Sequence, residues 1–241
     1  MTRHAYPILC LLLAFARCAH AAEPSAAVPA AKTYLSELVS LLQVDWPRNR
    51  TVNIVCHGHS VPAGYFKTPE VRSLEAYPGL MRADLAGRFP HAVINVIVTA
   101  IGGETSVAGA ARFEKDVLNH QPDLVLIDYA LNDRRVGLPA ARAAWAAMIE
   151  QAQAQGIKVL LLTPTPDVTA RLDDPADPLL QHAAQIRELA AEYQVGLVDS
   201  LAAFQKYTAA GGDLQNVMAQ GNHPNGRGHR LVADALAEWF P

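Results

Sequence analysis

Five short apolar runs alternate with segments of helical periodicity along most of this chain, and this alternation restricts the folds that it can adopt. The runs cover residues 52–56, 93–100, 124–129, 158–162 and 196–199. The helical segments cover residues 75–88, 108–119, 138–155, 179–193 and 226–239. Strands that alternate with helices form parallel sheets with right-handed crossovers. The sequence therefore predicts an α/β fold, a three-layer α/β/α sandwich around a five-stranded parallel sheet.

Length and charge narrow the class of protein further. The chain has 241 residues, which suits one α/β domain, and 51% of them are apolar, enough to bury both faces of a sheet. The net charge is −3, with no long run of either sign. This balance argues against a nucleic-acid partner or a polybasic membrane surface. Nothing in the sequence indicates an obligate protein partner.

The N-terminal residues have the pattern of an export signal. A weakly basic start is followed by the apolar stretch 8–15 and by Ala19-His20-Ala21, a small-x-small cleavage pattern. That stretch is much shorter than the ~20 residues that span a bilayer, so no integral membrane segment is expected after processing. We expect residues 1–21 to be removed and the product to be periplasmic or secreted. Cys18 is an alternative site of lipid attachment, which would make the product a lipoprotein, although Arg17 just before it fits such a site poorly.

The remaining chain divides into a lead and one domain. Residues 22–48 begin with an Ala/Pro-rich stretch and continue into a segment with apolar residues at helical spacing. Residues 49–241 hold the alternating strands and helices. After removal of residues 1–21, Cys56 is the only cysteine, so no internal disulfide is expected.

Four short motifs lie where ligands bind in such a sheet. Gly58-His59-Ser60, Gly102-Gly103 and Asn132-Asp133 each follow an apolar run, and His223 precedes the last helical segment. The carboxyl ends of parallel strands share one edge, and ligands bind in the crevice there. We therefore expect these residues, which are far apart in sequence, to lie around one cleft.

Together the motifs supply the groups of a serine acyl hydrolase. A serine hydroxyl needs a base to become a nucleophile, and histidine is the natural base near neutral pH. Backbone amides at a glycine and a side-chain amide can stabilise the oxyanion of acyl transfer. Taken singly, each motif has an ordinary alternative: a turn residue, a helix cap or a loop histidine without a role.

From about Val52 to the C-terminus, the motifs and their order resemble the SGNH hydrolases, the GDSL-type esterases and lipases. The resemblance implies a flavodoxin-like sandwich in which Ser60 is the nucleophile and His223 the base. It also implies an oxyanion hole formed by the Ser60 amide, Gly103 and Asn132. It requires no cofactor and no metal.

The sequence departs from the family pattern at three positions. His59 stands where the family has an aspartate, and Ala130 where it has a glycine. Most important, Gln220 stands where an aspartate orients the histidine; a glutamine oxygen accepts the same N–H bond but lacks the charge. Gln220 is therefore a candidate orienter of His223, and a backbone carbonyl is another. The candidate carboxylates, on the segment 165–178, are Asp167, Asp173 and Asp174.

These features predict an exported serine ester hydrolase that acts on a small-molecule, glycan or lipid ester, such as an acetylated glycan. The long segments 61–74 and 165–178 leave the predicted catalytic edge and are candidate walls of its cleft. Tyr65 is a candidate residue of the substrate wall, and His59 is expected to contact either the catalytic loop or that wall.

Two other functions stay open from the sequence. Loss of the orienting aspartate would suit a non-catalytic protein that keeps the cleft to bind a glycan or lipid. Alternatively, His57, His59 and His223 would suit a three-histidine zinc site.

Overall fold

The computed structural model describes residue 1 and residues 27–241. Nearly all of the predicted signal peptide, and the start of the lead, therefore lie outside the described residues. Within the described part of the chain, no helix is both long enough and apolar enough to cross a membrane.

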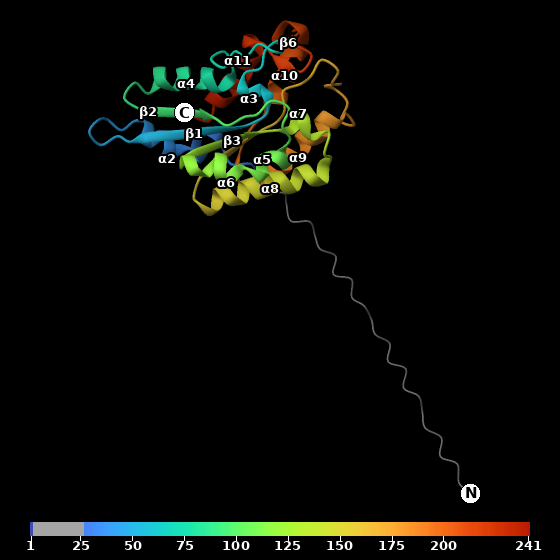
Figure 1. The fold of residues 1–241 in the computed structure, drawn as a ribbon, viewed down its shortest axis with the longest axis horizontal. Helices are drawn as coiled ribbons and strands as arrows, with labels where there is room; N and C mark the ends of the chain where they lie inside the picture. The colour runs from blue at the N-terminus through green and yellow to red at the C-terminus, as the bar shows by residue number, and fades with distance from the viewer. Residues whose placement is uncertain (2–26) are drawn as a thin grey trace.

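A five-stranded sheet forms the centre of the molecule (Figure 1). Its strands are β1 (Thr51–Gly58), β2 (Val93–Val98), β3 (Leu124–Asp128), β4 (Lys158–Leu162) and β5 (Gly196–Val198). The order is β2-β1-β3-β4-β5, and all neighbouring pairs are parallel. The predicted α/β fold and five-stranded parallel sheet are confirmed, with strand ends that differ from the apolar runs by a residue or two.

Helices cover both faces of the sheet, as the prediction of three layers requires (Figure 1). One layer contains α4 (Tyr77–Arg88), α10 (Ser200–Ala209) and α11 (Gly226–Ala237). The other contains α5 (Ser106–Ala111), α6 (Phe113–Asp116), α8 (Leu138–Ala154) and α9 (Pro178–Glu192). Two short N-terminal helices, α1 (Ala31–Tyr34) and α2 (Ser36–Leu42), precede β1, and α2 buries Leu38 and Leu42 in the core.

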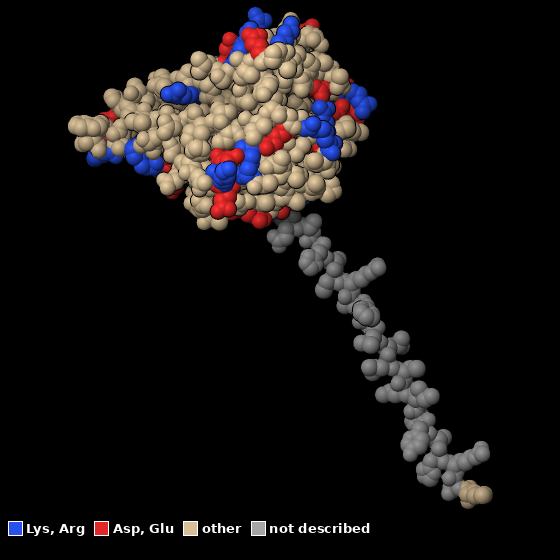
Figure 2. Space-filling model, viewed as in Figure 1, with Lys and Arg blue, Asp and Glu red and all other residues tan. Residues whose placement is uncertain are grey.

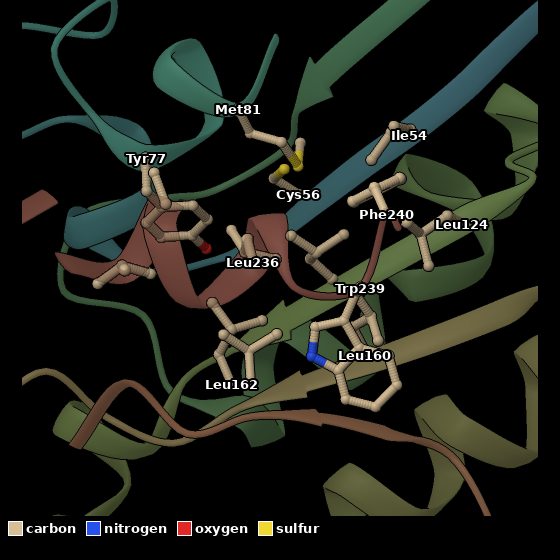
Figure 3. Close-up of a cluster of buried hydrophobic side chains, with 14 of the residues drawn as sticks. Ile54, Cys56, Tyr77, Met81, Leu124, Leu160, Leu162, Leu236, Trp239 and Phe240 are labelled. Carbon is tan, nitrogen blue, oxygen red and sulfur yellow. The ribbon is translucent and has the colours of Figure 1, made fainter. Parts of the chain in front are cut away.

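The core consists of two apolar clusters, one on each face of the sheet. Successive side chains of a strand point to opposite faces, so Ile54 joins one cluster and Val55 the other. Figure 3 shows the first cluster, in which strand residues meet side chains of α4 and of the C-terminal segment. Its labelled members include Cys56, whose burial raises the pKa of the thiol and keeps it protonated.

Several elements differ from the predicted ones. The single helix expected at residues 108–119 is divided into α5, α6 and the 3-10 turn η1 (Leu118–His120). The break falls at Arg112, which leaves helical geometry at φ −113° and ψ 5° and turns its side chain to Glu104. Helix α10 was not predicted, although Asp199 caps it by accepting from the Ala202 amide.

The remaining short elements lie at the sheet edge where the motifs were expected to meet. They are α3 (Ser60–Ala63), α7 (Ala130–Asp133), the 3-10 turn η2 (Leu214–Val217) and an antiparallel pair of strands, β6 (Met218–Gln220) and β7 (His223–Pro224).

The face of the molecule seen in Figure 2 carries charged side chains of both signs in small mixed groups. No large patch of one sign lies on that face, in keeping with the small net charge of −3.

Close packing at Gly196 provides a test of the core. A Cβ atom there would lie 2.2 Å from Leu160 Cδ2 and 2.8 Å from the Trp239 ring. We expect Gly196→Ala to lower the free energy of unfolding by about 1–3 kcal/mol, the usual cost of overpacking. Gly87→Ala is the control: its Cβ would meet nothing within 4 Å, and alanine favours a helix by about 1 kcal/mol. Urea unfolding measures both, and equal stability of the two variants would contradict the packing described.

Candidate active site

Ser60 and His223 lie together at the carboxyl end of the sheet. Ser60 begins α3, directly after β1, and its Oγ lies 3.0 Å from His223 Nε2. Both side chains are buried. The turn needs Gly58 because a Cβ there would lie 2.4 Å from the Asp128 carbonyl oxygen. The fold thus brings together two residues that are 163 positions apart, in the geometry of a nucleophile and its base.

A backbone carbonyl holds the other nitrogen of the histidine ring. His223 Nδ1 lies 3.3 Å from the Phe66 carbonyl oxygen, which can only accept, so the ring carries its proton on Nδ1. The lone pair of Nε2 is then free to accept the Ser60 hydroxyl proton. Burial lowers the pKa of His223 below its ordinary 6.5; the Phe66 carbonyl opposes this shift and the neighbouring His59 adds to it.

The Gln220 side chain is not hydrogen-bonded to the His223 ring, so this candidate orienter was wrong. Its Oε1 accepts from the Thr68 amide at 3.0 Å, and its Nε2 donates to Asn222 Oδ1 at 3.1 Å and Thr68 Oγ1 at 3.3 Å. The side chain therefore points along the hairpin to the segment that presents the Phe66 carbonyl. Gln220 acts on that segment and not on the imidazole.

The candidate carboxylates of segment 165–178 do not bind His223 either. Asp167 accepts from Arg134 at 2.5 Å and from Thr169 Oγ1 at 2.6 Å. Asp174 pairs with Arg171 at 3.0 Å, and Asp173 is exposed. Of the orienting groups considered, the structure shows the backbone carbonyl.

The candidate oxyanion donors follow the two strands that flank β1. Gly103 follows β2 and has φ +77°, a conformation that favours glycine. The amide of Ile101 donates to the Gly58 carbonyl at 3.0 Å, which ties this turn to the nucleophile strand. Asn132 lies in α7, directly after β3, and its Nδ2 donates to the Glu104 carbonyl at 3.0 Å. One N–H of that amide is thereby fixed, and the second is left for a ligand.

Of the two contacts expected for His59, the structure shows the one with the catalytic loop, and the side chain is fully buried. It caps α3: its Nδ1 accepts from the Val61 amide at 3.2 Å and lies 3.4 Å from Ser60 Oγ. Its Nε2 faces Asp128 Oδ1 at 3.5 Å. In place of the family aspartate, His59 therefore supports the turn that carries the nucleophile.

Tyr65 lies where a wall of the cleft was expected. Its ring centroid is 5.8 Å from that of His223, and a Cβ on Gly102 would lie 2.8 Å from the same ring. Tyr65 thus packs between the candidate base and the candidate oxyanion turn. Its contact with a substrate stays a prediction.

The three histidines of the zinc alternative do not converge. The His57 ring binds elsewhere, with Nδ1 at 2.8 Å from Thr99 Oγ1 and Nε2 at 3.0 Å from the Tyr129 hydroxyl. Among the residues that the structure describes, no group of three or more His, Cys, Asp or Glu side chains is arranged to hold a metal ion.

Comparison with known proteins agrees with this arrangement. A model described as the GDSL-like lipase/acylhydrolase family matches residues 56–231. The chain belongs to this family. The match spans all four motifs, and the predicted membership of the SGNH hydrolases is confirmed. A comparison with curated proteins gave no match.

Solved structures share the family fold. A two-domain esterase, CEX, active on acetylated mannans, matches with a TM-score of 0.71 and 21% identity over 90% of this chain. The chain spans only 54% of that protein. Axe2, an acetylxylan esterase from Geobacillus stearothermophilus, matches with a TM-score of 0.66 and 22% identity, over 78% of this chain and 94% of its own. LAE5, an alpha/beta hydrolase from the metagenome of Lake Arreo, Spain, has the same TM-score, 0.66.

The pKa of His223 gives a test of the site. Only the neutral ring accepts a proton, so kcat/KM for an uncharged ester falls as His223 becomes protonated. Because burial lowers its pKa, we expect the midpoint of this acidic limb to lie below pH 6.5. A pH–rate profile measures it, and a midpoint at or above 6.5 would contradict the site described.

Unfolding must be followed at each pH in that experiment. Burial also lowers the pKa of His57 and of His229 to about 4. The unfolded chain therefore binds more protons than the folded one as the pH falls from 6.5 toward 4, and stability declines over that range. Tryptophan fluorescence separates this loss of fold from protonation of the base.

Proposed function

We propose that this protein is an exported serine esterase that removes acetyl groups from glycans. The observation that carries the proposal is the 3.0 Å contact between Ser60 Oγ and His223 Nε2 at the carboxyl edge of the sheet. The turn at Gly103 follows the strand on one side of β1, and Asn132 follows the strand on the other side. Family membership supports acyl transfer as the reaction.

In the proposed reaction, His223 takes the hydroxyl proton as Ser60 Oγ attacks the ester carbonyl carbon. The carbonyl oxygen becomes an oxyanion, which accepts from the Ser60 and Gly103 amides and from Asn132 Nδ2. The imidazolium returns the proton to the leaving alcohol, and an acyl-serine remains. Water then attacks that ester with His223 as base, and collapse of the second intermediate releases the acid and restores Ser60.

The chemistry of the rim supports a glycan as the alcohol part of the ester. Polar side chains lie close to the candidate site: Gln220 donates to Asn222, which directly precedes His223, and Arg135 donates to the Gly103 carbonyl. Tyr65 offers an aromatic face next to the base. Two structural neighbours are esterases of acetylated mannan and of acetylxylan, and the mannan esterase was co-crystallized with mannopentaose. At 21–22% identity these proteins share the fold, and their substrates motivate the proposal.

The rival function is binding without turnover. It was motivated by the missing aspartate, whose place is taken here by the Phe66 carbonyl, a weaker but correctly directed acceptor. Because the ring is oriented and within hydrogen-bond distance of Ser60, the geometry favours catalysis over a cleft that only binds.

Ser60→Ala tests the proposal on an acetylated xylo- or manno-oligosaccharide. We expect loss of turnover by about 10³-fold or more, since the nucleophile is removed. Ser40→Ala, at an exposed position of α2, is the matched control and should leave the rate unchanged. A fluorophosphonate probe should label Ser60 in the control and not in the variant.

The same protein assayed against 4-nitrophenyl esters of increasing acyl length tests the substrate class. Acetyl esters should be preferred, and addition of a chelator should not change their rate. Turnover that survives in Ser60→Ala, or a probe adduct on another residue, would refute the mechanism. A preference for long acyl chains would refute the glycan substrate and leave the esterase.

Export has its own test, since it rests on the N-terminal sequence. The N-terminus of the processed product should begin at Ala22 or Glu23, following cleavage after Ala21 or Ala22. To test this, the full-length chain is expressed in a bacterial host, the cytoplasm and periplasm are separated, and the N-terminus of the protein in each fraction is sequenced. An intact N-terminus on a cytoplasmic product would contradict export.

A further inference from the structure

A nearly buried carboxylate lies directly behind the candidate oxyanion turn and takes no part in the proton transfers described above. Glu104 follows Gly103, and its side chain is only 9% exposed. It accepts from Arg112 Nε at 2.8 Å and from the Tyr129 hydroxyl at 2.8 Å, and it also pairs with the Arg112 terminal nitrogen. A buried charge of this kind is costly unless it is fully paired, and these contacts pair both carboxylate oxygens.

The hydrogen bonds of this cluster run in one direction and end on Glu104. His57 is neutral because burial lowers its pKa to about 4. The Gly109 carbonyl lies 3.2 Å from His57 Nε2 and can only accept, so the ring carries its proton on Nε2, which also lies 3.0 Å from the Tyr129 oxygen. Nδ1 is then the acceptor of its contact with Thr99 Oγ1 at 2.8 Å. Burial raises the pKa of Tyr129, so its hydroxyl stays protonated and donates to the carboxylate.

The backbone of Glu104 joins the two candidate oxyanion donors. Its carbonyl accepts from Asn132 Nδ2 at 3.0 Å, and its amide closes the turn by donating to the Ile101 carbonyl at 3.2 Å. Gly103, one position earlier, has φ +77° and no side chain of its own, and its carbonyl accepts from a terminal nitrogen of Arg135 in an exposed contact. A residue anchored through its side chain and bonded through both backbone groups therefore stands between Gly103 and Asn132.

We propose that Glu104 is a positioning residue of the oxyanion hole. Its carboxylate, held by Arg112 and Tyr129, fixes the turn that presents the Gly103 amide and, through its carbonyl, the Asn132 amide. Since donors of this kind stabilise charge that exists only in the transition state, Glu104 acts on kcat and not on substrate affinity. The inference rests on the proposed esterase function.

Glu104→Gln tests the inference, because glutamine keeps the size of the side chain and removes the charge. We expect kcat for an acetyl ester to fall by about 10- to 100-fold with KM within twofold. Affinity for an alkylboronic acid, which forms a tetrahedral adduct with the serine, should fall in proportion to kcat/KM. Glu114→Gln, an exposed position in α6, is the matched control and should match wild type in every measurement.

Tyr129→Phe covers the case in which Glu104→Gln fails to fold. It removes one donor to the carboxylate and keeps the ring packed, while His57 Nε2 retains the Gly109 carbonyl. We expect a three- to tenfold fall in kcat with KM unchanged. Urea unfolding confirms that the variants compared are folded.

The outcomes are distinct. The inference is overturned if folded Glu104→Gln, or Tyr129→Phe in its place, keeps kcat within twofold of wild type. A raised KM at constant kcat overturns it as well, since that pattern means lost ground-state binding. Failure of the proposed function itself appears separately, as absence of Ser60-dependent turnover in both wild type and Glu114→Gln.

Discussion

The parallel pairing of β1 with a neighbour on each side is the constraint on which the active site depends. In the order β2-β1-β3-β4-β5, the strand that carries Ser60 lies between the strands that lead to Gly103 and Asn132. Parallel pairing places the ends of all three strands at one edge. Two hydrogen bonds then bring the three turns into contact. One runs from the Ile101 amide to the Gly58 carbonyl, and the other from Asn132 Nδ2 to the Glu104 carbonyl. If one of these strands were shifted along its neighbour, the nucleophile would move away from the oxyanion donors.

The histidine depends on a second constraint, the segment that follows α3. A carboxylate would both orient the ring and stabilise its positive charge, whereas the Phe66 carbonyl contributes its dipole alone. Burial lowers the pKa of His223 and the Phe66 carbonyl only partly opposes this shift, so the ring is neutral near pH 7 and ready to accept a proton, but its protonated form is less stabilised. The bonds between Gln220 and Thr68 hold the segment in place. The position that carries the family aspartate thus still serves the histidine, through the backbone that it binds.

The strands and the meeting of Ser60 with His223 were predictable because their signals are local. An apolar run marks a strand, and the motifs of Ser60, Gly103 and Asn132 each follow such a run, while His223 lies just before the last helical segment. The residue whose carbonyl accepts from His223 Nδ1 could not be predicted, because every residue has a carbonyl. Phe66 takes this role only because the path of segment 61–74 brings its carbonyl to the ring. The break at Arg112 was missed for a related reason. Helical periodicity continues through it, and a tertiary ion pair with Glu104 overrides that pattern.

The cluster around Glu104 shows why a site made of backbone donors needs charged support. An amide N–H has no side chain of its own to lock it, and glycine at φ +77° has the most freedom to lose. A neighbouring residue can restrain the glycine backbone if its own side chain is held strongly. The Glu104 carboxylate is held in this way by Arg112 and Tyr129, and a neutral side chain would be bound more weakly. The same residue reaches Asn132 through its carbonyl. The buried charge therefore serves the geometry of the oxyanion donors, while Ser60 and His223 carry out the proposed proton transfers without a charged partner.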